Sequence, residues 1–211
     1  MSRLAVSGRQ EFAATLLATA RQRAPALYSV IMQRLLLSCI LAGLLLAAQQ
    51  THRDEVRSLG AAEDARANSP NVPDAEAING HFDRIAIVRL KYQTDLLAGL
   101  EKIVQQQHIR NAVILSAIGS VRNYQVHAVS NRTFPSRDTF TQDPSAPADV
   151  IGMSGYVIDG RIHAHISMAT PEKAFGGHLE PGTNVFTFVA VTIGVLADPI
   201  DIRRIDDKTY R

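Results

Sequence analysis

The chain has 211 residues, 46% of them hydrophobic, and its single cysteine excludes internal disulfides and any zinc site built from several cysteines. Its 22 basic and 20 acidic residues give a net charge of +2, but the first fifty residues contain five arginines and only one acid. Removing these leaves 17 basic and 19 acidic residues, so the remainder of the chain is slightly acidic. Because nucleic-acid binding depends on Lys and Arg side chains that neutralise phosphates, this balance argues against a DNA-binding role.

An apolar leader segment precedes the predicted domain. Residues 35–48 carry no charge, and fourteen residues are short for a membrane span, which needs about 20, but suit the apolar region of a signal peptide. Arg34 supplies a basic flank and Ala47–Ala48 a small-residue cleavage site. We expect Met32 to be the natural start. Residues 1–31 would then be an upstream extension, and residues 32–49 a signal peptide or membrane anchor.

Other interpretations of this leader stay open. Cys39 loosely resembles a lipoprotein cleavage box, although most of the apolar run lies after the cysteine. The arginine-containing, acid-poor stretch also fits an organelle transit peptide, and the apolar run fits a buried amphipathic helix. The signal-peptide interpretation predicts an exported or periplasmic protein, or a membrane-anchored one, rather than a cytoplasmic one.

Residues 50–81 are rich in alanine and charged residues and contain Ser69–Pro70 and Val72–Pro73. No apolar periodicity persists through them. They are predicted to form a solvated linker, with a short helix over residues 55–67.

Residues 82–211 are predicted to form one compact α+β domain, because a strand and a helix are followed by strands only, which is typical of a mostly antiparallel sheet. Thr94 is expected to cap the helix, which ends at residues 105–108. Runs of β-branched and apolar residues predict strands at 84–90, 111–118, 121–130, 150–158, 161–169 and 185–196, with 202–205 closing the sheet.

The connections follow from turn chemistry. Asp159–Gly160 lies between two predicted strands and is a strong signal for a hairpin. Gly119 is expected to end the strand before it. Residues 133–148 and 170–183 are predicted to be loops.

The candidate chemistry lies in the stretch after that hairpin. His163 and His165 are two apart on a predicted strand, so their side chains project from one face about 6–7 Å apart. His178 follows Gly176–Gly177, and glycines let the backbone turn back close to the strand. Three neutral imidazoles with an open fourth position are typical of a catalytic or exchangeable zinc site. We predict that His163, His165 and His178 bind Zn²⁺ or another divalent metal.

The alternative is that the His-x-His pair consists of ordinary polar residues on a half-exposed strand. The remaining histidines are predicted to be surface residues or satisfied core residues: His52, His81, His108 and His127. An enzyme would need an acid, a base or an arginine beside the metal, and the nearest candidates are expected to be solvated charges: Arg122, Glu172, Lys173 and Glu180. The sequence has no Gly-rich phosphate loop, no His-Glu-x-x-His helix and no nucleophile elbow.

Four short motifs together resemble the PPC (plants-and-prokaryotes-conserved) domain. They are Gly-Ser-Val-Arg at 119–122, Ser-Gly at 154–155, Ile-His-Ala-His-Ile-Ser at 162–167 and Gly-Gly-His-Leu at 176–179. The resemblance covers about residues 82–205. It implies a curved antiparallel sheet with one main helix, assembly as a homotrimer and, as in some members, zinc on the three histidines.

The resemblance leaves three functions open. Plant members carry AT-hooks and bind AT-rich DNA, but this sequence has no Arg-Gly-Arg-Pro hook. The fold is also similar to that of acetolactate decarboxylases, in which zinc acts as a Lewis acid. The favoured function is a non-catalytic, metal-binding homotrimer. The alternatives are a zinc-dependent enzyme acting on a small oxygenated substrate and a DNA-binding protein. The expected partners are further copies of the chain and a small-molecule ligand at the metal, with no membrane contact for the folded domain.

Overall fold

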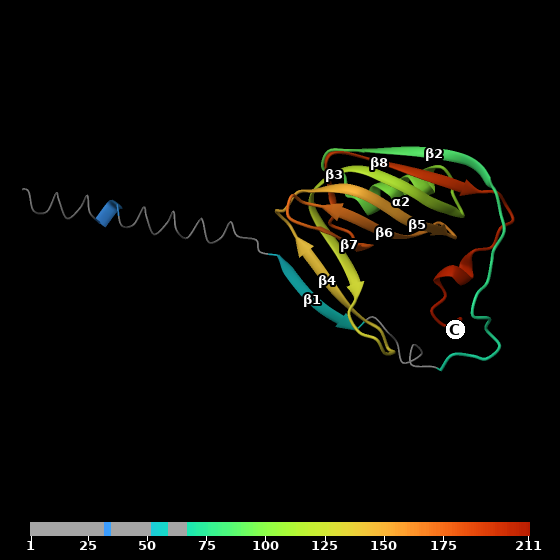
Figure 1. Cartoon of the computed structure of the whole chain (residues 1–211). Helices are drawn as coiled ribbons and strands as arrows, with labels where there is room; N and C mark the ends of the chain where they lie inside the picture. The colour runs from blue at the N-terminus through green and yellow to red at the C-terminus, as the bar shows by residue number, and fades with distance from the viewer. Residues whose placement is uncertain (1–31, 35–51, 59–66) are drawn as a thin grey trace, which may run out of the picture. The chain divides into compact units, whose positions relative to one another are not determined.

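The computed structural model of the protein describes residues 32–34, 52–58 and 67–211, and Figure 1 draws the rest as a thin grey trace. The apolar run of the predicted leader and its cleavage site lie outside the described residues. Within the described part of the chain, no helix is long and apolar enough to cross a membrane. The chain divides into two units, residues 1–49 and 50–211, and the second contains the predicted domain.

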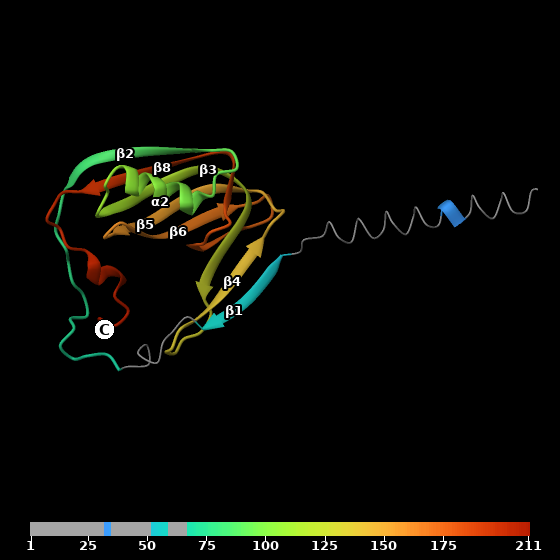
Figure 2. The same ribbon diagram turned by 180° about the vertical axis from the view of Figure 1, so that it is seen from behind.

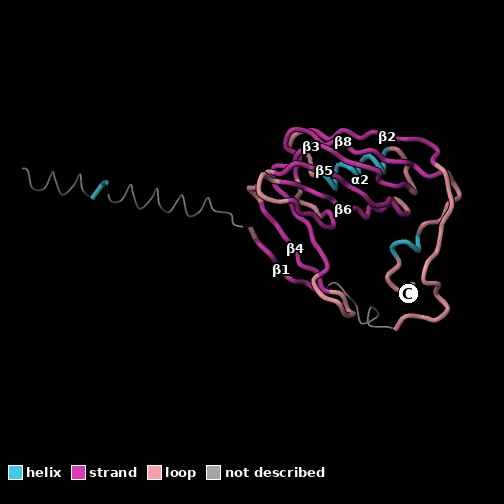
Figure 3. The backbone as a smooth tube through the Cα atoms, in the orientation of Figure 1, coloured by secondary structure: helices cyan, strands magenta, loops and turns pink. Residues whose placement is uncertain are grey.

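The second unit is built on one eight-stranded sheet whose pairs are all antiparallel. Its strands are β1 (Arg53–Ser58), β2 (Phe82–Lys91), β3 (Ala112–Val129), β4 (Arg137–Asp143), β5 (Ala148–Ile158), β6 (Arg161–Ala169), β7 (Ala174–Leu179) and β8 (Asn184–Leu196). The order is β1-β4-β3-β5-β6-β7, and β8 joins β2 to β3. Because β7 also pairs with β3, the strands β3, β5, β6 and β7 form a closed ring. Figure 3 shows how strands dominate this unit.

One helix packs against the curved sheet. Helix α2 (Leu96–Gln106) contacts β2, β6 and β8, and the opposite views of Figures 1 and 2 both place it against the strands. Its buried residues Leu96, Leu100 and Val104 are four apart and form one apolar stripe. Burying each such side chain contributes about 1.5–3 kcal/mol. Asp95 caps the helix by accepting a hydrogen bond from the Ala98 amide, one residue after the predicted cap.

The two faces of the sheet differ around β2, β3 and β8. Val189, Val191 and Ile193 alternate along β8 and are buried in the core beneath α2. The opposite face is apolar but exposed, with Ile87 at 76% and Ile118 at 61% relative accessibility. A single copy of the chain therefore leaves several large hydrophobic side chains of these strands exposed.

The antiparallel α+β fold with one main helix is confirmed, and so is the hairpin between β5 and β6. Asp159 and Gly160 have φ values of 48° and 79°, the left-handed conformation that this type of turn requires. However, the two strands predicted on either side of Gly119 are one continuous strand, β3. Gly119 has a φ of 142° and sits at a register shift, and a Cβ there would collide with the carbonyl oxygen of Phe188. The glycine therefore bends the strand instead of ending it.

Four further predictions of local structure are wrong. The loops predicted at 133–148 and 170–183 contain β4 and β7, and residues 53–58 of the predicted linker and helix are strand β1. The segment 202–205 does not extend the sheet, because Arg203–Asp206 form a short 3₁₀ helix, η2. In β1 and β4, pairing with distant residues overrides a polar local composition, and in β7 it overrides the Gly-Gly pair.

Candidate metal centre

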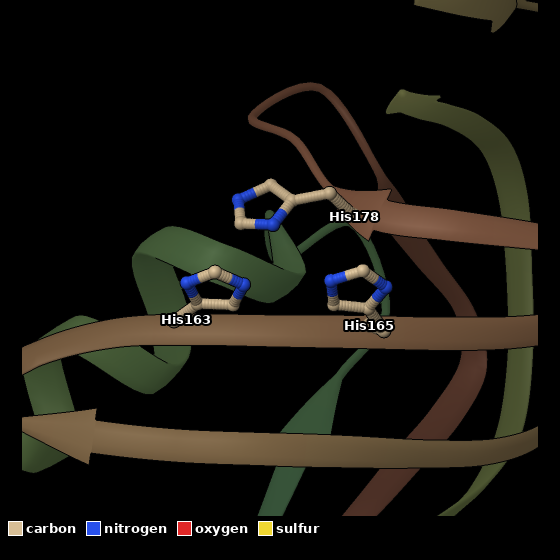
Figure 4. A group of neighbouring side chains, drawn as sticks. All are labelled: His163, His165 and His178. Carbon is tan, nitrogen blue, oxygen red and sulfur yellow. The ribbon is translucent and has the colours of Figure 1, made fainter. Parts of the chain in front are cut away.

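The sheet brings the three predicted histidines together. His163 and His165 lie on β6, and His178 on β7 is the cross-strand partner of His165. Figure 4 shows the three rings converging above β6. The ring centroids of His163 and His165 are 5.5 Å apart, and those of His163 and His178 are 4.8 Å apart. One nitrogen from each ring lies within 4.8 Å of the other two.

The Gly-Gly pair explains how His178 reaches this position. Strand β7 runs between β6 and β3, and both neighbours approach its backbone closely. A Cβ on Gly176 would collide with the carbonyl oxygen of Ile166, and one on Gly177 with that of His127. Only glycine lets the strand fit there, and the next residue, His178, is thereby held beside β6.

The donor set fits a divalent metal with nitrogen ligands. Tetrahedral zinc with Zn–N bonds of about 2.0–2.1 Å holds its nitrogens about 3.3 Å apart. The three histidine nitrogens lie within 4.8 Å of one another, so modest ring rotations reach that geometry. Neither His165 nor His178 has a side-chain hydrogen-bond partner among the described residues, which leaves their ring nitrogens available.

The protonation of these rings favours metal binding at neutral pH. Burial, together with the nearby rings of His127 and His163, lowers the pKa of His178 to about 4. Burial also lowers the pKa of His165, with His163 adding to the effect. Both imidazoles are therefore neutral at pH 7 and present the lone pair that a metal requires.

An acid that the sequence did not reveal contacts the cluster. Asp206, in η2, lies 2.8 Å from the Nδ1 atom of His163 and 43 residues further along the chain. A carboxylate that accepts a hydrogen bond from Nδ1 leaves Nε2 free to bind an ion. No local pattern connects these residues, because only the return of the chain after β8 brings them together.

His127 also lies in this region, where it is half-buried and hydrogen-bonded, in agreement with the prediction of a satisfied residue. His127 lies on β3 and is the cross-strand partner of His178 on β7, and their rings stack with centroids 4.5 Å apart. Its Nδ1 atom lies 2.6 Å from Glu180 Oε1, so Glu180 is not a solvated loop charge. His127, His178 and Glu180 form a second group of potential ligands. In this second group the Nδ1 atom of His127 and one oxygen of Glu180 are already engaged with each other.

A cavity of about 340 Å³ opens beside the first histidine group. His163, His165 and Asp206 line it together with Tyr156, Ser154 and apolar side chains that include Ile205. No Lys or Arg among the described residues lines this cavity. The space therefore suits a small ligand that is largely apolar and does not carry several negative charges.

The other residues considered beside the metal lie elsewhere. Arg122 donates a hydrogen bond to the Tyr92 hydroxyl, 3.2 Å away, and Lys173 lies over the ring of Phe175. Glu172 is exposed. Among the described residues, none of these three belongs to the ligand groups or lines the cavity.

The fold and the histidine motif identify the family. Residues 77–197 match the model of the Plants and Prokaryotes Conserved (PCC) domain, and the chain therefore belongs to this family. This match confirms the resemblance to the PPC domain, which is the same domain.

Solved structures with this fold include proteins from two archaea. A metal-containing protein from Archaeoglobus fulgidus is 22% identical with a TM-score of 0.53, and the match covers 64% of this chain and 95% of that one. A plant- and prokaryote-conserved (PPC) protein from Pyrococcus horikoshii is 21% identical with a TM-score of 0.51, over 60% of this chain and 87% of that one. At these identities the likeness establishes the fold.

A curated relative contains a similar segment within a much longer protein. The bifunctional protein GlmU of Synechococcus sp. (strain JA-3-3Ab) is 30% identical over 123 residues, which is 57% of this chain. The matched segment is 18% of that protein, so the chain spans less than a fifth of the length of the relative. The match therefore supports the domain and carries no activity to this chain.

Proposed function

We propose that this protein binds a divalent metal, zinc in the first instance, through His163, His165 and His178. The observation that carries the proposal is the convergence of three ring nitrogens, within 4.8 Å of one another, from two neighbouring strands. The lowered pKa values of His165 and His178 keep those rings neutral at pH 7. A protein from Archaeoglobus fulgidus with the same fold is described as metal-containing, which agrees with this proposal.

The test is the metal content of the chain after removal of any His tag. Elemental analysis after incubation with zinc and gel filtration is expected to give about one zinc per chain. His163→Ala and His178→Ala should each remove this zinc without unfolding the domain, because neither residue belongs to the buried hydrophobic core. The matched control is His81→Ala, which removes an exposed histidine that belongs to neither ligand group. Stoichiometric zinc in the variant that combines His163→Ala with His178→Ala would reject the assignment.

We also propose that the protein assembles as a homotrimer through the exposed apolar face of β2, β3 and β8. Ile85, Ile87, Ile118 and Phe188 lie on this face and remain exposed in a single copy. Such a patch is typical of a protein–protein contact. Covering it with the same face of further copies would remove it from water.

A second candidate function is an enzyme that acts on a small oxygenated molecule. The observation that favours it is the cavity of about 340 Å³ beside His163 and His165, which gives a ligand access to the cluster. A bound divalent ion would supply a Lewis acid that polarises an oxygen of the ligand. In this scheme Tyr156 and Ser154 are the polar residues of the cavity that orient the ligand. Turnover of hydroxy-ketones or 2-keto acids by the zinc-loaded protein, absent in His165→Ala, is the discriminating assay.

A further inference from the structure

The chain after β8 returns to the histidine cluster. The PCC match ends at residue 197, and η2 lies beyond it. Ile205 and Asp206 of this segment line the same cavity as His163 and His165. The cavity therefore has one wall that the matched domain does not provide.

Several contacts fix the position of this segment. The Asn111 side-chain amide donates a hydrogen bond to the carbonyl oxygen of Ile200, and Ile202 is buried. Arg204 forms an ion pair with Glu76 at 3.1 Å. These contacts anchor the chain before Asp206, and beyond it the Ser69 amide donates a hydrogen bond to the carbonyl oxygen of Arg211, so the carboxylate is held in place instead of being carried on a loose end.

Asp206 touches the cluster through one ring only. Its Oδ1 atom lies 2.8 Å from His163 Nδ1, and its side chain is 25% exposed. No oxygen of Asp206 belongs to the group of ligand atoms that lie within 4.8 Å of one another. Asp206 therefore lies on the Nδ1 side of the His163 ring and not at the fourth ligand position. No comparable carboxylate contacts His165 or His178 among the described residues.

We propose that Asp206 is a positioning residue of the metal centre. By accepting the Nδ1 hydrogen of His163, it holds the ring in the tautomer that presents Nε2 to the ion and restricts rotation of the ring. Such outer carboxylates typically change metal affinity about 10–100-fold. The inference rests on the proposed metal function, and it assigns a role in that function to residues 198–211.

The experiment measures zinc affinity of the full chain by competition with a chromophoric chelator. Asp206→Ala is expected to weaken zinc binding by about 10–100-fold. Asp206→Asn keeps an acceptor oxygen at the same position and loses the charge, so it should recover most of that loss. Asp207→Ala is the matched control, because Asp207 is the adjacent acid, is exposed and bonds only Thr209 and the local turn. The visible spectrum of the Co²⁺-loaded protein should also change in Asp206→Ala and stay unchanged in the control.

A double-mutant comparison separates positioning from a general effect on stability. The His163→Ala chain is expected to lose zinc on gel filtration, so its weak residual affinity is measured by direct titration at high zinc concentration. In this background Asp206→Ala should cause no further loss of affinity, because the ring that it orients is gone. An equal loss in both backgrounds would assign Asp206 a structural role and overturn the proposal. So would wild-type affinity in Asp206→Ala. If that variant does not fold, Asp206→Leu replaces it, because Leu is of similar size and cannot accept the Nδ1 hydrogen, and wild-type affinity in Asp206→Leu would overturn the proposal. If the wild-type chain binds neither Zn²⁺ nor Co²⁺, the proposed function itself fails, which is a different result.

Discussion

Acidification is expected to destabilise the metal-free protein, and His178 should account for much of the loss. The folded protein lowers the pKa of His178 from 6.5 to about 4, chiefly by burial. Between these two values the unfolded chain binds a proton that the folded chain does not. The unfolded state is therefore favoured progressively as the pH falls from about 6.5 towards 4, and the effect is absent above that window.

The size of the effect follows from the two pKa values. At pH 5, a group with a pKa of 6.5 in the unfolded chain and about 4 in the folded one favours unfolding by about 2 kcal/mol. The ring is only half-buried, and solvent screening reduces this to about 1 kcal/mol. Burial lowers the pKa of His165 as well, so its contribution has the same sign.

The assay is urea denaturation followed by far-UV circular dichroism, with a chelator present, at pH 7 and at pH 5. The wild-type protein should lose about 1 kcal/mol more stability between these pH values than His178→Gln, which cannot titrate. His81→Gln removes an exposed histidine and should behave as the wild type. If the wild type and His178→Gln lose the same stability on acidification, the argument from burial is wrong.

Two further predictions concern the strand that carries His178 and the exposed face. Gly177→Ala places a Cβ against the carbonyl oxygen of His127, so it should destabilise the protein by about 1–3 kcal/mol in denaturation experiments and weaken zinc binding in chelator competition. The control is Gly152→Ala, whose Cβ would meet nothing nearer than Ser167 Cβ at 4.0 Å, and it should change neither stability nor zinc affinity. Ile87→Glu should convert the proposed trimer to monomers in light scattering coupled to gel filtration, because it places a charge on the exposed face, whereas Val129→Glu, which is exposed at the far end of β3, should not. A wild-type chain that is monomeric at high concentration would contradict the proposed assembly.

The sequence indicated those features that depend on neighbouring residues. The Asp159–Gly160 turn, the β-branched runs of β6 and β8 and the apolar stripe of α2 are local signals, and the structure contains all of them. The pairing of His163 with His165 on one face follows from the two-residue period of a strand. Their approach to His178 was suggested by the Gly-Gly pair, although the sequence placed that pair in a loop.

The features that were missed depend on contacts between distant residues. Strand β4 is polar and contains Asp138, Thr141 and Gln142, and it is a strand because β3 and β1 pair with its two edges. The contacts of Asp206 with His163 and of Glu180 with His127 join residues 43 and 53 positions apart. No spacing rule in the sequence predicts such contacts.

A row of rings extends from the cluster to the first strand of the sheet. His178 stacks on His127, His127 lies 4.8 Å from the ring of Phe140, and Arg57 of β1 lies 4.6 Å above Phe140. Glu55 is the cross-strand partner of Phe140, and alternate side chains of a strand point to opposite faces. Inserting or deleting one residue within Arg53–Ser58 would therefore turn Glu55 and Arg57 away and bring alternate residues such as Val56 to this face. Related chains that keep an arginine over the ring of Phe140 should thus vary in length between β1 and β2 but not within β1 itself.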